Sequence, residues 1–328
     1  MKRSNGKASE RNRQMDKKRR TKKRKPWLKV VGAVIAVIIL AIGSYAFYLY
    51  HSAKKLVNED IHNPVDVIDT SLTKKKLNKT EPINILLLGI DAEGNQVGRS
   101  DAIMVMQLDP VSDEMTIVSI PRDTRTEIVG RGFQDKINHA FAFGVNECGV
   151  PCGANMSIAT VENLLDIEID YYVSINMDGL VELVDELGSI SVDNDIAWSD
   201  GKYDFPEGVV EMDGDKTKAF VRMRKKDPSG DFGRTQRQRK VIEGIIQKGA
   251  SIGSLPNLTN MMDVLGKNMS TNMDFDDMKS LFSDYRNTRR NINEYMLSGK
   301  GQMIDGIYYL IVSDEEVQKV HDMLTRDS

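Results

Sequence analysis

The sequence contains few of the residues that cross-link small domains or bind transition metals. It has two cysteines, Cys148 and Cys152, and four histidines in 328 residues. Two cysteines exclude a disulfide-rich scaffold and a zinc module with four cysteine ligands, and four scattered histidines argue against a histidine metal cage. The spacing Cys148-Gly-Val-Pro-Cys152 allows one small disulfide around a Gly/Pro turn in an oxidising compartment.

The sequence also lacks the motifs of the commonest covalent and nucleotide-dependent enzymes. It has no G-x-S-x-G elbow, no P-loop and no H-E-x-x-H pair. Covalent catalysis by serine or cysteine therefore has no support in the sequence.

Charge is divided unevenly along the chain. Residues 1–29 carry 14 Lys and Arg against two acids, whereas the remaining 299 residues carry 31 bases against 46 acids. A body with a net charge of −15 would repel phosphate backbones, so a uniformly basic nucleic-acid-binding protein is excluded and no nucleic-acid partner is expected. The low-complexity composition of the basic arm predicts that the arm is disordered.

An uncharged run separates the basic arm from the acidic body. Residues 30–50 read VVGAVIAVIILAIGSYAFYLY, and a helix of this length, about 31 Å, matches the hydrocarbon core of a bilayer. Trp27 at one end and three tyrosines at the other are placed as interfacial aromatics. A signal peptide is the competing interpretation, but the run is longer than the apolar region of such peptides and no A-x-A-like cleavage site follows it. We therefore expect an uncleaved transmembrane helix.

The charge bias predicts the orientation of this helix. A dense positive flank stays in the cytoplasm, so the N-terminus is expected inside and residues 51–328 outside, in a single-pass protein of the cell membrane. The arm could instead bind nucleic acid or anionic lipid, but the orientation of a transmembrane helix already accounts for the positive charge beside it. An external domain has no ATP or GTP, so any phosphoryl chemistry there must use a bond already present in its substrate.

The part of the chain after the apolar run reads as a stalk followed by one α/β domain. Residues 51–80 are polar and poorly periodic, with room for a short helix. Residues 81–328 alternate strands with amphipathic helices, which predicts a three-layer α/β/α fold with a central mixed sheet. The expected strands are residues 83–89, 102–108, 115–120, 171–176, 294–298 and 307–312. The expected helices are residues 138–144, 155–165, 177–187, 232–249, 256–267, 274–286 and a last helix from residue 313.

Two aspartates stand at the ends of neighbouring predicted strands. Asp91 terminates the first buried strand, and Asp101 opens the next one after a ten-residue loop. If the strands pair, both carboxylates lie at one edge of the sheet. Paired oxygen ligands with open positions suit Mg²⁺, although ordinary loop acids would look the same in the sequence.

A second cluster follows the third strand, where Ser119-Ile-Pro leads into Arg122 and Asp123. Ligands gather at such strand ends in open α/β sheets, but a purely structural Arg122–Asp123 pair is an equal alternative. Downstream, Lys136-Ile-Asn138-His139 offers donors just before a helix, where His139 alone is more plausible as a packing or capping residue than as a base.

Two further arginine groups lie before and within the 232–249 helix. Arg222 and Arg224 point the same way if their segment is extended. On the helix, Arg234 and Gln238 fall within the buried apolar stripe at 100° per residue. A buried guanidinium is costly unless it is paired, so Arg234 either meets an acid such as Asp231 or lines a cleft for an anion.

Taken together, five arginines and two carboxylates are expected near strand or helix ends. This set suits a pyrophosphate, whose charge is best met by guanidinium forks and a divalent cation. The arginines are Arg99, Arg122, Arg222, Arg224 and Arg234, and the carboxylates are Asp91 and Asp101.

In this order the residues resemble the signature motifs of the LytR–CpsA–Psr family. The resemblance covers about residues 81–250, and the short arm with a single span also fits. The motifs are Gly89-Ile-Asp91, Arg99-Ser-Asp101, Ser119-Ile-Pro-Arg122-Asp123, Lys136-Ile-Asn138, Arg222-Met-Arg224 and Asp231-Phe-Gly-Arg234 with Arg237-Gln238. The cysteine pair is not part of the family pattern.

The resemblance implies an enzyme at the outer face of a Gram-positive membrane. Such enzymes transfer an anionic glycopolymer, such as wall teichoic acid, from a polyprenyl-pyrophosphate carrier to peptidoglycan, and the acceptor is thought to be the C6 hydroxyl of N-acetylmuramic acid. The resemblance also implies an apolar tunnel for the lipid, with candidate lining residues on the helices at 155–165, 177–187 and 232–249.

The resemblance further implies roles for the matching residues. Asp91 and Asp101 would hold Mg²⁺ or Mn²⁺. The five arginines would bind the pyrophosphate, with Gln238 beside them. Transfer would proceed without a protein nucleophile, by positioning and electrostatic stabilisation from groups such as Arg122 and Arg224, with Asp101 or Asp123 as the general base.

Other functions stay open on the sequence alone. Hydrolysis of the same lipid pyrophosphate uses the same site, with water as the acceptor. A non-catalytic, membrane-tethered cell-wall regulator or a lectin-like wall binder is also possible. Direct control of DNA is disfavoured, because the arm of about 29 residues has no helix-turn-helix pattern.

Overall fold

The computed structural model describes residues 43–45, 47–92, 97–224, 226–251 and 264–325. The predicted basic arm and most of the predicted span lie outside these residues, and residues 43–45 and 47–50 are helical. Among the described residues, none of the helices combines the length and the apolar character that crossing a bilayer requires. The chain divides into two units, residues 1–50 and 51–328, and the features below belong to the second unit.

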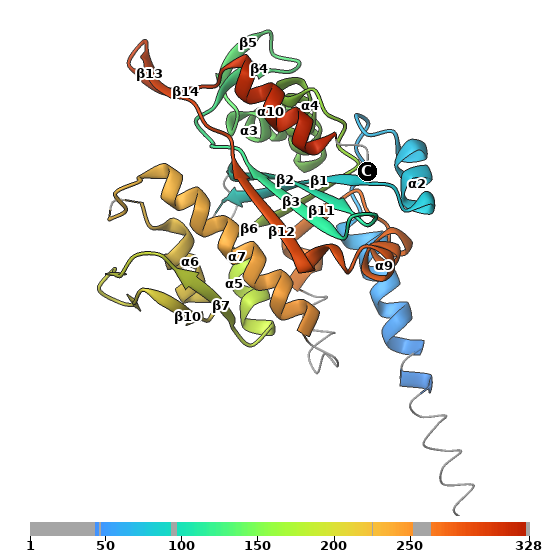
Figure 1. The fold of residues 1–328 in the computed structure, drawn as a ribbon. Helices are drawn as coiled ribbons and strands as arrows, with labels where there is room; N and C mark the ends of the chain where they lie inside the picture. The colour runs from blue at the N-terminus through green and yellow to red at the C-terminus, as the bar shows by residue number, and fades with distance from the viewer. Residues whose placement is uncertain (1–42, 46, 93–96, 225, 252–263, 326–328) are drawn as a thin grey trace, which may run out of the picture. The chain divides into compact units, whose positions relative to one another are not determined.

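A six-stranded mixed sheet forms the centre of the second unit (Figure 1). The strand order is β11-β6-β1-β2-β3-β12, in which β1 runs parallel to β6 and β12 to β3, and the other neighbours are antiparallel. The strands are β1 (Ile83–Asp91), β2 (Arg99–Asp109), β3 (Glu114–Ser119), β6 (Tyr171–Asn176), β11 (Met269–Thr271) and β12 (Asn291–Met296). The predicted central mixed sheet is therefore confirmed, and β11 is the strand of this sheet that was not predicted.

In the described part of the chain, four two-stranded hairpins lie outside the central sheet. Of their strands, β14 was predicted; most of the others are short and carry polar residues instead of an apolar run. The hairpins are β4 (Arg125–Ile128) with β5 (Phe133–Lys136), β7 (Ile190–Asn194) with β10 (Gly208–Met212), β8 (Trp198–Ser199) with β9 (Asp204–Phe205), and β13 (Lys300–Ile304) with β14 (Ile307–Ile311).

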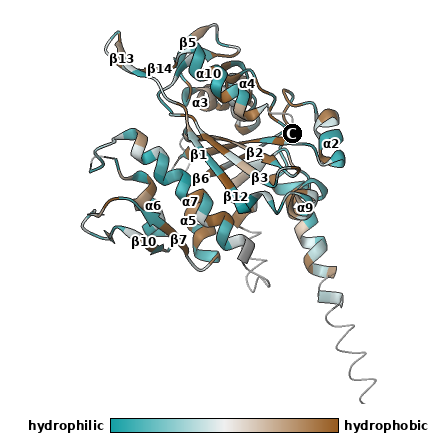
Figure 2. Ribbon diagram, in the orientation of Figure 1, coloured by the Kyte–Doolittle hydropathy of each residue, from teal (hydrophilic) through white to brown (hydrophobic). Residues whose placement is uncertain are grey.

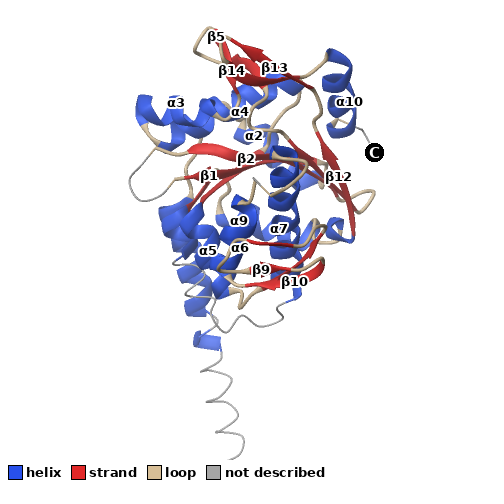
Figure 3. Cartoon of the chain, turned by 90° about the vertical axis from the view of Figure 1, so that its left-hand side faces the viewer, coloured by secondary structure: helices blue, strands red, loops and turns tan. Residues whose placement is uncertain are grey.

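Helices cover both faces of the sheet, as Figure 3 shows from the side. They are α2 (Thr70–Lys79), α3 (His139–Cys148), α4 (Val150–Leu165), α5 (Met177–Glu186), α6 (Gly214–Arg222), α7 (Asp231–Ser251), α9 (Phe275–Asp284) and α10 (Asp314–Leu324), with short turns η1 (Val57–Ile61) and η2 (Thr288–Arg290). Helix α6 was not predicted, because its buried face combines Phe220 and Val221 with Gly214 and Thr217 and so gives a weak apolar pattern. The predicted helix 256–267 falls mostly outside the described residues, and residues 264–268 are helical.

The two faces of the sheet have separate cores, because successive side chains along a strand point to opposite sides. One core packs Leu86 and Val105 against α3, α4 and α10. The other packs Ile85 and Met104 against α2, α7 and α9. The central strands carry many of the hydrophobic residues (Figure 2).

A third core lies beyond α7 and joins α5, α6 and the β7–β10 hairpin. The Trp198 and Phe205 rings stack with centroids 3.9 Å apart, and Phe220 of α6 packs against Phe205 at 5.6 Å. Aromatic pairs of this kind bury large apolar areas. Helix α7 is therefore covered by the sheet on one side and by this small layer on the other.

The segment 51–80 belongs to the folded unit and is not a separate stalk. Val57, Ile61, Val65 and Ile68 are all buried. Val65 and Ile68 join the core that also contains Leu86. The polar composition that suggested a stalk belongs to the outer face of this segment, where Val67 and Leu72 are also exposed.

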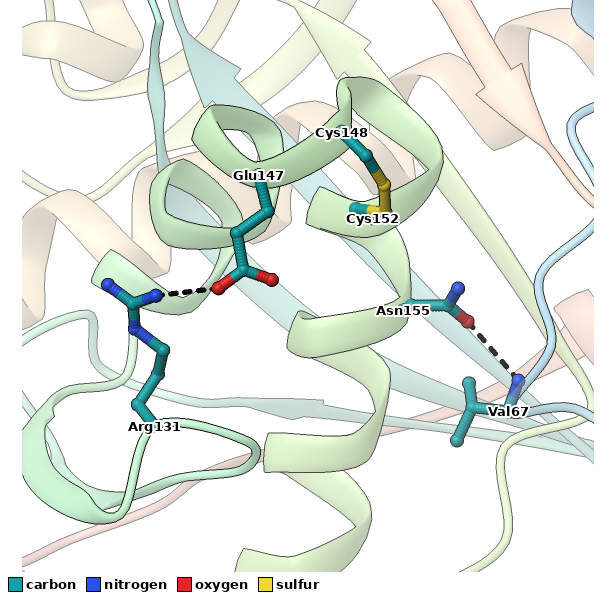
Figure 4. The surroundings of a disulfide bond; sticks show 6 residues. All are labelled: Val67, Arg131, Glu147, Cys148, Cys152 and Asn155. Atoms are coloured by element: carbon teal, nitrogen blue, oxygen red, sulfur yellow. Dashed lines mark hydrogen bonds and ion pairs between the residues drawn. A yellow bond between two sulfur atoms is a disulfide. The ribbon is translucent and has the colours of Figure 1, made fainter.

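The cysteine pair forms a disulfide at the corner between α3 and α4 (Figure 4). Cys148 ends α3 and Cys152 lies in the first turn of α4, with Cα atoms 5.7 Å apart. Neighbouring contacts attach this corner to two other segments. Glu147 pairs with Arg131 of the β4–β5 turn at 2.6 Å, and the Asn155 side chain accepts a hydrogen bond from the Val67 backbone.

A pair of carboxyl groups lies where α7 crosses the edge strand β12. Arg239 of α7 pairs with Glu294 of β12 at 2.5 Å, and Glu243 lies one helical turn further along α7. Burial, together with the neighbouring Glu294 carboxylate, raises the pKa of Glu243 to about 8 from an ordinary value of 4.5. Glu243 therefore keeps its proton in the folded state at a pH where the unfolded chain has lost it.

We expect the stability of the domain to fall as the pH rises from about 4.5 to about 8, because folding in that range requires uptake of a proton by Glu243. Replacing Glu243→Gln should make the thermal midpoint less dependent on pH across this interval. Glu207→Gln, at an exposed position, serves as the matched control. An unaltered pH dependence in the Glu243 variant would show that this group is ionised in the fold.

Candidate functional site: an arginine–aspartate cluster beside an apolar cavity

A β-bulge places Asp101 outside the regular strand pairing of β1 and β2. Gly89 pairs with Ala102 and Ile90 with Ser100, so Asp101 is the extra residue in β2. A Cβ added at Gly89 would lie 2.9 Å from the Ala102 Cβ, so glycine allows the two strands to approach here. Bulges of this kind redirect side chains next to functional sites.

The Asp101 carboxylate accepts hydrogen bonds from two different elements. Arg122 Nη1, just after β3, donates to Oδ2 at 2.5 Å, and Asn138 Nδ2, just before α3, donates to Oδ1 at 2.9 Å. Arg234 of α7 approaches Oδ2 to 3.7 Å. The predicted meeting of Asp101, Arg122 and Arg234 at one sheet edge is therefore present in the structure.

Asp231, in the first turn of α7, connects three of the arginines. Its carboxylate lies 3.0 Å from Arg234 Nη2, 3.5 Å from Arg122 Nε and 3.6 Å from Arg224 Nε. Asp231 is the acid that the sequence offered as a partner for Arg234, and its side chain forms that ion pair. It holds Arg224, whose side chain is 55% exposed, beside the two more buried guanidinium groups.

Asp91 and Arg222 form a second pair at the end of β1. Arg222 Nη2 donates to Asp91 Oδ1 at 2.6 Å, and both side chains are more than one-third exposed. Arg99 lies in register with Asp91 on the neighbouring strand, and its side chain is exposed. Arg222 ends helix α6 and the backbone becomes extended only at Met223, so the condition under which Arg222 and Arg224 would point the same way is not met.

Asp123 pairs mainly with a lysine and not with the preceding arginine. Lys136 Nζ of β5 donates to Asp123 Oδ1 at 2.6 Å, whereas Arg122 Nε is 3.9 Å from Asp123 Oδ2. Lys136 was noted as a donor in the sequence, but its partner became visible only when the β4–β5 hairpin was placed.

The cluster as a whole carries more positive than negative charge. It contains six cationic side chains (Arg99, Arg122, Lys136, Arg222, Arg224 and Arg234) and four carboxylates (Asp91, Asp101, Asp123 and Asp231). The surplus of two positive charges favours a bound anion.

Two of the buried guanidinium groups are also incompletely paired. Within the described part of the chain, the Nε atoms of Arg122 and Arg234 are buried and have no hydrogen-bond partner. Burial lowers the pKa of Arg234, and the nearby charges of Arg122 and Arg224 contribute to that shift against the attraction of Asp231 and Asp101. A phosphate oxygen at this position would supply both a hydrogen-bond acceptor and a compensating charge.

A buried ion pair shapes the loop that presents Arg222 and Arg224. Arg237 of α7 pairs with Asp227 and also donates to the carbonyl oxygens of Phe220 at 3.2 Å and Met223 at 2.5 Å. A Cβ added at Gly233 would clash with the Asp227 carboxylate, so this glycine is required for the close approach. Arg237 is almost completely buried, because the loop covers it.

An apolar cavity of about 90 Å³ begins one turn further along α7. Gln238, predicted to lie beside the arginines, is 7% exposed and lines this cavity. Other lining residues are Leu87, Leu88, Met104, Val173, Ile175, Met177, Leu180, Val221, Val241 and Ile242. They come from the sheet and from α5, α6 and α7, whereas α4, which corresponds to the predicted helix 155–165, packs on the opposite face of the sheet and does not line this cavity.

Asp91 and Asp101 are the predicted ligands of a divalent cation. Among the described residues, no three His, Cys, Asp or Glu side chains come together as a metal site. Mg²⁺ commonly takes only one or two carboxylates and completes its shell with water and substrate phosphate. The two aspartates stand near the paired ends of β1 and β2 and provide hard oxygen donors, so their chemistry fits Mg²⁺.

Comparison with known proteins places these residues in a described family. The sequence model of the LytR_cpsA_psr family matches residues 44–326. A Halalkalibacterium halodurans protein named polyisoprenyl-teichoic acid–peptidoglycan teichoic acid transferase TagU is 43% identical over 299 residues, which cover 90% of this chain and 95% of that protein.

Solved structures agree with this relationship. The crystal structure of Bacillus subtilis TagU is 39% identical, with a TM-score of 0.60, and the match covers 74% of this chain and 95% of that chain. A structure described as TagT bound to LIIa-WTA is 29% identical, with a TM-score of 0.63, and covers 81% and 95% of the two chains. The chain described here belongs to the LytR_cpsA_psr family.

Proposed function

We propose that this protein is a membrane-anchored transferase. It moves an anionic cell-wall glycopolymer, such as wall teichoic acid, from a polyprenyl-pyrophosphate carrier to a hydroxyl group of peptidoglycan. The proposal rests on one observation. The surplus positive charge lies beside an apolar cavity, and the buried Nε atoms of Arg122 and Arg234 have no hydrogen-bond partner among the described residues. A pyrophosphate with a lipid tail has the same two parts. The names of the relatives support the choice of polymer and acceptor.

The residues would act by binding and charge stabilisation. The acceptor oxygen attacks the phosphorus that carries the glycopolymer, the bond from that phosphorus to the bridging oxygen breaks, and the lipid phosphate leaves. Arg122, Arg224 and Arg234 would bind the phosphate oxygens, on which negative charge builds up during transfer. The acceptor proton would pass to Asp101 or Asp123. Mg²⁺ held by Asp91 and Asp101 would neutralise further charge on the pyrophosphate.

The cavity would receive the part of the lipid nearest the pyrophosphate. Its volume of about 90 Å³ is far below that of a whole polyprenyl chain, so α5 and α7 would have to move away from the sheet to admit more of it. Gln238 lies between the charged cluster and the apolar lining and would mark the boundary between head group and tail.

Membrane anchoring and orientation belong to the same proposal. The apolar run at residues 30–50 and the preceding basic arm support an N-terminus in the cytoplasm and a catalytic domain outside. Protease treatment of intact cells should degrade residues 51–328, and protection of that part would contradict the proposed orientation.

Arg224→Ala should lower the rate of glycopolymer transfer by about 100- to 1000-fold, the usual cost of removing one donor to a transition-state oxyanion. The side chain is more than half exposed, so the variant should fold normally. Arg122→Lys, which keeps the charge but loses the planar fork, should also be impaired. Arg290→Ala, an exposed arginine in η2, is the control.

These variants are assayed with purified full-length protein in detergent, lipid-linked donor, and peptidoglycan oligomers. Wild-type turnover by Arg224→Ala would refute the assigned role. Release of free polymer by the wild-type protein, with no polymer joined to glycan, would identify a hydrolase instead.

Asp91→Asn should weaken the response of transfer to Mg²⁺, because it removes one of two proposed carboxylate ligands. The rate is measured after chelation and during titration with Mg²⁺ or Mn²⁺, and Asp66→Asn at an exposed position is the control. Equal activity with and without chelator in the wild-type protein would exclude the cation from the reaction.

Leu180→Trp should fill part of the cavity, because Leu180 of α5 lines it. We expect a higher KM for donors with long polyprenyl chains and little change for a donor with a single short prenyl unit. A change that is equal for both donors would place the lipid elsewhere.

A further inference from the structure

We propose that a second surface of this protein binds the sugar rings of the glycan that accepts the polymer. This inference rests on the proposed function, because it names the site of the second substrate. The surface, called here the acceptor strip, consists of Phe133, Asp135, Lys136, His139 and Phe143, together with Tyr309, which is buried beneath them.

One end of the acceptor strip touches the charged cluster. Lys136 Nζ is 2.6 Å from Asp123 Oδ1 and also lies 5.9 Å from the centroid of the Tyr309 ring. The Leu310 backbone N–H donates to the Asp123 carbonyl oxygen at 2.9 Å, which fixes β14 beside the residue that follows Arg122. The acceptor strip therefore begins next to the groups proposed to bind the phosphate.

The middle of the acceptor strip consists of polar side chains whose orientations are fixed by hydrogen bonds. The Asp135 carboxylate accepts a hydrogen bond from the Tyr309 hydroxyl at 3.3 Å and lies 2.8 Å from His139 Nδ1. Burial would raise the pKa of Asp135, but the hydrogen bonds from His139 and the Lys136 backbone hold it below its usual value. An ionised carboxylate and an oriented imidazole are suitable partners for sugar hydroxyl groups.

The outer end of the acceptor strip is aromatic. The His139 and Phe143 rings meet edge to face at 5.9 Å, and Phe143 meets Phe133 in the same way at 5.8 Å. The Phe133 side chain is 45% exposed although it is large and apolar. A pyranose ring has C–H bonds on one face and hydroxyl groups around its rim, so an aromatic ring next to polar groups matches it chemically.

The position of the acceptor strip indicates that its ligand is the acceptor glycan. The apolar cavity belongs to the face of the sheet covered by α5 and α7, whereas α3 packs into the core of the opposite face. Figures 1 and 3 both show β5, β14 and α3 on the side of the sheet away from α5 and α7. In a phosphoryl transfer the attacking and leaving oxygens lie roughly in line on opposite sides of phosphorus. A leaving lipid phosphate on the cavity side therefore requires the hydroxyl to arrive from the side of the acceptor strip.

Phe133→Ala should weaken the binding of uncrosslinked peptidoglycan oligosaccharides to the full-length protein by about 5- to 10-fold, the range expected for one aromatic contact. The side chain is exposed, so folding should be unaffected. His139→Gln tests the polar part of the acceptor strip, and Phe282→Ala removes a 74% exposed aromatic ring on α9 as the matched control. Binding is measured by calorimetry, first with the oligosaccharide and then with the lipid-linked donor.

The expected result is weaker oligosaccharide binding by both strip variants, with donor binding and the control unchanged. Wild-type oligosaccharide affinity in both strip variants would overturn the inference. Weaker binding of the lipid-linked donor alone would also overturn it, because the acceptor strip would then bind the glycopolymer. The calorimetry, combined with the transfer assay described above, separates this inference from the proposed function. Strip-dependent glycan binding without any transfer would disprove the transferase and leave the acceptor strip standing.

Discussion

The Asp101 carboxylate holds together the parts of the chain that form the candidate site. It sits on a bulge in β2 and receives hydrogen bonds from Arg122 after β3 and from Asn138 before α3, while Arg234 reaches it from α7. A carboxylate that is only 12% exposed is stable in its charged form only with such partners. The requirement to satisfy this buried charge fixes the position of the arginines before any substrate is present.

The arginines of the site are held in place without being fully neutralised. Each aspartate in the cluster contacts at least one cationic side chain, yet the cluster keeps two more positive than negative charges. Arg222 and Arg224 remain half-exposed, whereas Arg122 and Arg234 are largely buried. The buried pair thus provides a rigid base, and the exposed pair can exchange an aspartate for a phosphate oxygen at little cost in solvation.

Helix α7 connects the charged cluster to the rest of the domain. Asp231 and Arg234 in its first turns belong to the cluster, and Arg237 fixes the loop that presents Arg224. Further along, Val241 lines the cavity, and Arg239 anchors the helix to β12. A single rigid element therefore sets the distance between the proposed head-group and lipid sites, and the opposite face of the sheet is left for a second substrate.

The sequence by itself determined the central strands, most of the helices and the residues of the candidate site. Long apolar runs such as residues 83–89 allow only a buried strand, and the 3.6-residue period placed Arg234 and Gln238 on the inner face of α7, where both are buried. Chemical type was also enough to predict that arginines and aspartates would gather at one sheet edge.

Only the tertiary structure decided how these groups are paired and what surrounds them. The bulge at Asp101 depends on strand register, and the burial of Arg237 depends on a loop that folds over it from residues distant in sequence. The β4–β5 hairpin has no apolar pattern of its own and was not predicted, although Lys136 and His139 of the acceptor strip were noted as donors in the sequence. Residues 51–80 joined the core, since a few well-placed apolar side chains can be buried in a segment whose composition is polar.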